Sequence, residues 1–143
     1  MEGTNNSTRR LAFWSAAIVV GNFLAIIWHL LLLVEVQPST PNFLPPLLLA
    51  VNLFPIAGIL AFTRGFPKLA AGMIIVPLGV ALVIGSYSHF FSPGADNVFR
   101  MPPGPLRSTF QVSAMLLVIL EGLGCSFGFR MLTYVPMKQA LRP

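Results

Sequence analysis

Few side chains in this sequence could do chemistry, because only 9% of its 143 residues are charged. Among the ionisable ones, His29, His89 and Glu121 lie inside long apolar stretches. Ionisable residues in such stretches face the interior of a helix bundle or a water-filled cavity, where they mark ligand sites or proton pathways. The two histidines are therefore candidate ligands of a haem or a metal ion, and the carboxyl group is a candidate proton carrier.

A haem and a metal ion would each need particular residues around the two histidines. A haem held between them would want basic partners for its propionates, which Arg100 and Arg107 could supply. A metal ion would want further ligands, and the nearby carboxylates are those of Glu35 and Asp96. A small organic ligand such as a quinone is another possible ligand of the same two histidines. Hydrogen-bonded packing with no ligand is the remaining alternative.

The stretch SYSHFFSPGADNVFRMPPGPLRSTF, residues 86–110, gathers most of these candidates. The connection 92–107 within it is rich in turn-forming Gly, Pro, Ser and Asn. A loop of this length in so small a bundle is either functional or disordered, and its aromatic and arginine residues favour a folded cap. We expect it to lie across the bundle as a candidate lid over a pocket. The candidate ligand-binding residues are His29, Ser86, Tyr87, His89, Asp96, Arg100 and Arg107.

Three polar residues are expected at one depth in the membrane. Asn22, Asn52 and Glu121 each lie near the middle of an apolar stretch, so at 1.5 Å per residue they form one layer. A lone carboxyl group there is expected to be neutral unless a cation offsets its charge, and to donate to one of the amides. The layer serves either as a hydrogen-bonded contact between helices or as a site that handles protons or cations.

Four apolar stretches position these residues, each long enough to cross about 30 Å of hydrocarbon as a helix. We expect spans at about 11–34, 43–63, 68–91 and 108–132. Continuous apolar runs exclude the alternating strands of a membrane barrel. The short connections predict an all-α integral membrane protein with one domain, 1–143, folded as an up-down four-helix bundle. In such a bundle the first and third helices face each other diagonally across the core.

The basic residues indicate how the bundle is oriented. With the N-terminus in the cytoplasm, the outer side carries only two of the nine Lys and Arg residues, Arg100 and Arg107. The inner side carries the others, which are Arg9, Arg10, Arg64, Lys68, Arg130, Lys138 and Arg142. We therefore expect both termini in the cytoplasm, the segment 92–107 outside, and the plasma (inner) membrane as the location.

Composition also narrows the class of protein. With 55% hydrophobic residues and four Asp and Glu, the chain has too few charges to cover a water-exposed surface. The lipid bilayer is thus its expected partner, and the net charge of +5 reflects orientation rather than a nucleic-acid surface. The motifs of P-loops, serine hydrolases, zinc proteases and dithiol enzymes are absent from the sequence, so no enzyme activity is predicted.

We expect a protein that binds or passes a small, anionic or amphipathic molecule through an outward-facing pocket. Two other classes remain open. One is a non-catalytic subunit of a larger membrane complex, or a homo-oligomer, formed through the helix face of Gly124 and Gly128. The other is a haem-bearing electron carrier that uses His29 and His89.

Overall fold

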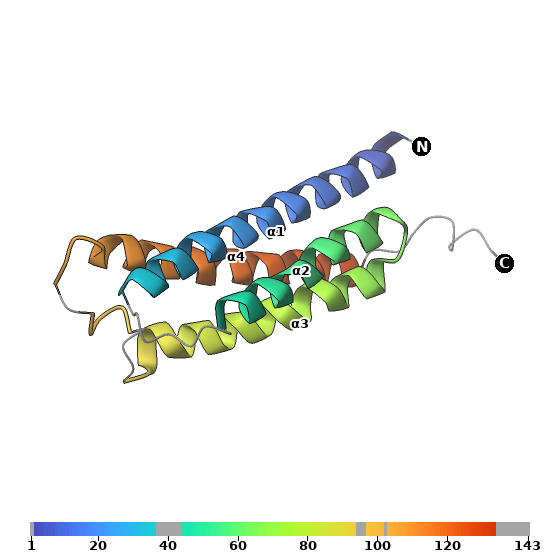
Figure 1. Cartoon of the computed structure of the whole chain (residues 1–143). Coiled ribbons are helices and arrows are strands. Elements are labelled where there is room, and N and C mark those ends of the chain that lie inside the picture. The colour runs from blue at the N-terminus through green and yellow to red at the C-terminus, as the bar shows by residue number, and fades with distance from the viewer. Residues whose placement is uncertain (1, 37–43, 94–96, 102, 134–143) are drawn as a thin grey trace.

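The computed structural model describes residues 2–36, 44–93, 97–101 and 103–133. Over these ranges the chain is an all-α bundle without strands (Figure 1). Its long helices are α1 (Glu2–Val36), α2 (Leu44–Thr63), α3 (Pro67–Ser86) and α4 (Arg107–Leu132). A π-helical turn, η1 (Tyr87–Phe91), continues α3. The predicted fold class is therefore confirmed.

The helices follow one another around the bundle. α1 packs against α2 and α4, and α3 packs against the same two helices, so α1 and α3 stand on a diagonal. The N-terminal end of α1, the turn between α2 and α3, and the C-terminal end of α4 all lie at one end of the bundle (Figure 1). We call this the terminal end, and the opposite end, with the 92–107 connection, the loop end.

The helices match the expected spans closely. Asn6–Val36, Pro67–Phe91 and Arg107–Leu132 are each long and apolar enough to cross a membrane, and Leu48–Thr63 of α2 is a shorter apolar helix. The chain is thus an integral membrane protein by the length and composition of its helices. The one large difference is at the N-terminus, where α1 begins at Glu2, well before the expected start at Leu11.

Local sequence chemistry explains the turn between α2 and α3. Gly65 has a φ of 87°, the left-handed conformation that glycine adopts without cost. Its N–H donates to Phe62 O, and the next N–H, of Phe66, donates to Ala61 O. These two bonds form a Schellman motif, which satisfies carbonyls at the end of α2. Pro67 then starts α3, where its missing N–H costs nothing.

Small residues set how closely the helices approach one another. A Cβ atom built on Gly58 of α2 would lie 3.0 Å from the backbone oxygen of Ala70 and 2.9 Å from Ile74 Cγ1. One built on Gly128 of α4 would lie 2.6 Å from Ile75 Cγ1. Gly124, one turn away, faces Leu78 in the same way. The glycine face of α4 therefore packs against α3 within this bundle.

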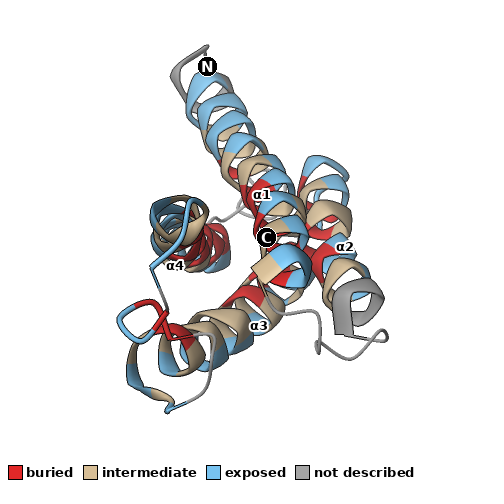
Figure 2. Ribbon diagram, turned by 60° about the vertical axis from the view of Figure 1, so that its left-hand side comes forward, coloured by how far each residue is buried: buried red, intermediate tan, exposed pale blue. Residues whose placement is uncertain are grey.

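Two apolar clusters fill the core, and buried residues face inward along every helix (Figure 2). The outer cluster, at the loop end, contains Ala25, Ile26, Leu30, Leu33, Val98, Met101, Phe110, Ala114 and Leu117. The inner cluster, at the terminal end, contains Ala61, Phe62, Ala70, Ala71, Ile74, Leu78 and Met131. Large side chains such as Leu24, Val83 and Ile119 are exposed on the outside, as expected for a surface that faces lipid.

The described basic residues keep the predicted asymmetry. Arg9, Arg10, Arg64, Lys68 and Arg130 lie on elements at the terminal end, and Arg100 and Arg107 lie at the loop end. The two remaining predicted inner residues, Lys138 and Arg142, are outside the described residues. The bias agrees with a cytoplasmic terminal end, which stays a prediction.

Candidate functional site

The two histidines meet inside the bundle at the loop end. His29 of α1 and His89 of η1 are both buried, and their ring centroids are 4.8 Å apart at an interplanar angle of 77°. Phe110 of α4 lies against both rings, at 4.7 Å from His29 and 6.0 Å from His89. Three helices thus contribute one ring each to a cluster in which His89 meets the other two rings edge-to-face, and we call it the histidine cluster.

A hydroxyl group orients one of the imidazoles. His29 Nδ1 is 2.8 Å from Ser113 Oγ, and both residues are buried. Ser113 Oγ also lies within hydrogen-bond distance of Phe110 O, at 2.8 Å. The Ser113 hydroxyl thus joins the His29 imidazole of α1 to the Phe110 backbone of α4, and the direction of the His29–Ser113 bond follows the tautomer of the imidazole.

The π-helical turn connects the histidine cluster to the loop. At its end, Ser92 N–H donates to Tyr87 O, five residues back, at 2.8 Å. The carbonyl oxygen of His89 instead accepts the N–H of Val98 at 2.9 Å. The backbone of His89 thereby holds the loop against the bundle.

The described part of the loop is folded and packs into the core. Asn97 is buried, its Nδ2 donates to Ser92 O at 2.8 Å, and its Oδ1 accepts from Phe99 N–H at 2.9 Å. Val98 is also bonded to α4, because Gln111 Nε2 donates to Val98 O at 2.7 Å. The side chains of Val98 and Met101 belong to the outer cluster. This segment, 97–101, thus closes part of the loop end.

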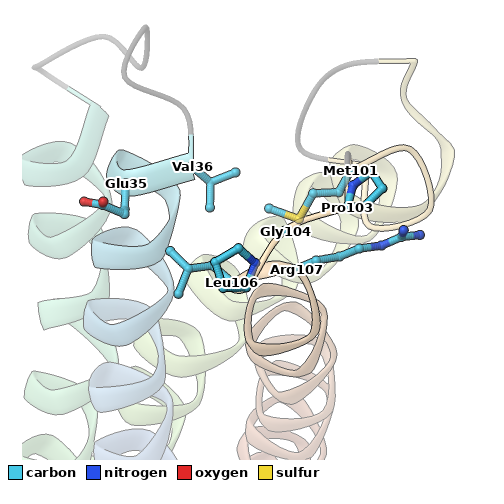
Figure 3. Close-up of a pocket in the computed structure, with 8 residues that line it drawn as sticks. Glu35, Val36, Met101, Pro103, Gly104, Leu106 and Arg107 are labelled. Atoms are coloured by element: carbon cyan, nitrogen blue, oxygen red, sulfur yellow. The ribbon is translucent and has the colours of Figure 1, made fainter.

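An open pocket of about 200 Å³ lies at the loop end, between the end of α1 and the segment that leads into α4. Figure 3 shows Val36, Met101 and Leu106 around it, while the side chains of Glu35 and Arg107 extend to opposite sides. Pro103, Gly104 and Pro105 complete the lining. The wall is therefore apolar, and the two charged groups lie at its rim.

The predicted ligand-binding residues fall into separate places. His29 and His89 form the buried cluster, whereas Arg107 lines the pocket. Tyr87 is 60% exposed on the outside of the bundle, beside the half-buried Ser86. The remaining two are Arg100, which is exposed on the loop, and Asp96, which lies outside the described residues.

Two of the three residues predicted to form a polar layer are joined by a hydrogen bond. Asn22 Nδ2 donates to Asn52 Oδ1 at 3.0 Å, which joins α1 to α2, and Asn52 Nδ2 donates to Leu48 O at 2.8 Å. Glu121 is buried at the same depth of the bundle, with its Oε2 facing Gly85 of α3. The expected hydrogen bond from Glu121 to an amide is not formed, since Glu121 Oε2 and Asn22 Oδ1 both lack a partner.

The residues of the histidine cluster do not fit a haem held between the two rings. Their edge-to-face contact leaves no space for a macrocycle, and His29 Nδ1 is engaged by Ser113. Within the described residues, no three His, Cys, Asp or Glu side chains lie close enough to hold a metal ion. The cluster as it stands is a hydrogen-bonded packing unit that ties α1, η1 and α4 together.

Several residues of this region carried no clear sequence signal. Ser113 and Phe110 lie in the first turns of an apolar helix, where a serine or a phenylalanine is unremarkable by itself. Asn97, Val98 and Met101 lie in a stretch whose prolines and glycines indicate only turns. The spacing of Phe110 and Ser113, three residues apart on one helix face, was the one hint that they act together.

Comparison with known protein families, with curated proteins and with solved structures finds no match to this chain.

Proposed function

We propose that this membrane protein binds a small amphipathic molecule at the loop end of its bundle. The observation that carries the proposal is the pocket between α1 and the start of α4. Its wall is built by Val36, Met101 and Leu106, and Arg107 stands at its rim. An apolar body would be buried against the wall, and a polar or anionic group would stay near the guanidinium in water.

The size of the pocket limits the ligand. Its volume of about 200 Å³ is below the range of about 300–1,000 Å³ that is usual for drug-sized molecules. The pocket therefore suits a small molecule, or the end of a longer chain whose remainder lies in the lipid. A single-chain amphiphile fits the size of the site, and an anionic head group would lie on the Arg107 side of the rim, away from the Glu35 carboxylate.

The loop gives the site a way to open. Met101 is both a wall of the pocket and a member of the outer cluster, so moving the loop would change both. Two hydrogen bonds hold Val98, one to the His89 backbone and one to the Gln111 side chain. In this proposal the described loop segment 97–101 acts as the lid, and the histidine cluster is its anchor in the bundle.

The two alternative functions have less support. The glycine face that a partner subunit would use is occupied by α3, since Gly124 and Gly128 pack against Leu78 and Ile75. A haem carrier would require His29 and His89 to move apart. Ligand binding at the pocket needs no such rearrangement.

Photolabelling would test the proposal, with the full-length protein in lipid nanodiscs and a diazirine derivative of lauric acid as the probe. We expect labelled peptides to map to 101–107 and to the end of α1. Leu106→Trp should fill the pocket and lower labelling there about tenfold, equivalent to about 1.4 kcal/mol of binding free energy. Leu123→Trp is the matched control, because Leu123 is an exposed leucine of α4 that does not line the pocket. Equal labelling in both variants would contradict the proposal.

A further inference from the structure

Two buried oxygen atoms at the middle of the bundle have no hydrogen-bond partner. They are Oδ1 of Asn22 and Oε2 of Glu121, on side chains that are 1% and 4% exposed. A buried acceptor without a donor destabilises the folded state, and does so more where the group is charged. Two such atoms in one small core therefore require an explanation.

The two side chains lie at one depth and on equivalent faces of adjacent helices. A Cβ atom built on Gly21 of α1 would be 3.9 Å from Leu120 Cδ2 of α4, so these two residues lie opposite each other. Asn22 and Glu121 are the next residues on the two helices and therefore lie at nearly the same depth. His29, seven residues after Asn22 on the same stripe of α1, bonds to Ser113 of α4. Asn22 and Glu121 thus lie about two helical turns closer to the terminal end than His29 and Ser113, and both face the interior of the bundle.

The two amide nitrogens of this layer donate away from these oxygens. The amide nitrogen of Asn22 donates to Asn52, and that of Asn52 donates to the backbone of Leu48. On the α3 side, Glu121 Oε2 faces Gly85, which has no side chain to offer. In its ionised form the Glu121 carboxylate, like the Asn22 amide oxygen, therefore faces the core as an acceptor without a donor.

No fixed positive charge lies at this depth. Between Ser15 and His29 in α1, between Lys68 and Tyr87 in α3, and along the whole of α2, the sequence holds no ionisable side chain. The ionisable neighbour of Glu121 is the thiol of Cys125 on its own helix, whose Sγ lies 3.9 Å from Ile75 O. Thiols are weak donors, so Cys125 does not neutralise the carboxyl group.

We propose that Glu121 and Asn22 form an occluded site for one monovalent cation, either a proton or an alkali metal ion. A carboxylate and an amide oxygen are hard oxygen ligands, and one positive charge would satisfy both orphan acceptors and remove the buried negative charge. The site lies between the outer cluster, which contains Leu117, and the inner cluster, which contains Leu78. It is separate from the loop-end pocket and does not depend on ligand binding there.

Thermal unfolding of the purified full-length protein tests the site, because a ligand that binds the folded state raises its melting temperature. Wild type, Glu121→Gln and Glu35→Gln are compared in sodium chloride and in choline chloride at equal ionic strength, over a range of pH. Glu35 is an exposed carboxylate at the loop end and provides the control. We expect a shift of several degrees in wild type and Glu35→Gln that is lost in Glu121→Gln.

The two sources of positive charge give different results. An alkali-ion site raises the melting temperature in sodium chloride at fixed pH, whereas a proton site raises it as the pH falls, whichever salt is present. If Glu121→Gln does not fold, Asn22→Ala takes its place, since it removes one of the two oxygens and should weaken the same dependence. The proposal is overturned if the cation and pH responses of the substituted protein equal those of wild type.

Discussion

Replacing Phe110 by alanine is expected to lower the free energy of unfolding by about 3–5 kcal/mol. The Phe110 ring is fully buried, touches both imidazoles and lies in the outer cluster with Val98 and Met101. Its loss leaves a cavity that the rigid helices cannot close. Because the loop packs on the same cluster, the segment 97–101 should also loosen. Denaturant titration in detergent micelles, followed by circular dichroism, measures the loss of stability.

Phe129→Ala is the matched control for this prediction. Phe129 belongs to the same helix but is 57% exposed on the lipid-facing side. Its truncation should change the free energy of unfolding by no more than about 0.5 kcal/mol. Similar losses in the two variants would show that Phe110 does not sit in a close-packed core.

A second large effect is expected from Gly58→Leu, which should separate α2 from α3. Even a Cβ atom at this position would come within 3.0 Å of the Ala70 backbone oxygen and within 3.2 Å of Met73 Cβ. Backbone cannot rotate away as a flexible side chain can, so the helices themselves must shift. We expect a loss of about 1–3 kcal/mol or more in the free energy of unfolding, measured by the same titration.

Gly72→Leu separates packing from the general effect of removing a glycine. Gly72 lies in α3, and a Cβ atom built there would meet nothing within 4 Å. Its replacement should be neutral, or stabilising by about 0.5–1 kcal/mol through the gain in helix propensity. If Gly72→Leu destabilises the protein as much as Gly58→Leu does, the loss of stability does not come from the close contact of α2 and α3 at Gly58, and the prediction is wrong.

Much of the fold was predictable because hydropathy is a strong signal over twenty residues. The expected start of the last span, 108, differs by one residue from the observed start of α4 at Arg107. The beginning of α1 was missed because Glu2 to Arg10 are polar, and a polar helix outside the hydrocarbon leaves no trace in hydropathy. The π-helical turn at Tyr87–Phe91 also had no local signal, since it adjusts α3 to its contacts with the loop.

The site was predictable only where helical periodicity determines it. The seven-residue spacing from Asn22 to His29 indicated one inward stripe, and both residues are buried there. The partner of each side chain depends on helix register, which the sequence does not encode locally. Ser113 was therefore missed as the partner of His29, and Asn22 bonds to Asn52 rather than to Glu121.

The most direct test of an outward-facing binding pocket is the reactivity of a cysteine placed in its wall. Leu106→Cys in a Cys125→Ser background, reconstituted in sealed vesicles, is exposed to a membrane-impermeant thiol reagent on the side opposite the termini. We predict that the thiol reacts from that side and that lauric acid slows the reaction severalfold by occupying the pocket. Phe99→Cys, on the exposed surface of the loop, should react at a rate that lauric acid leaves unchanged. Reaction of Leu106→Cys only from the side of the termini, or at one rate with and without lauric acid, would contradict the pocket as a ligand site.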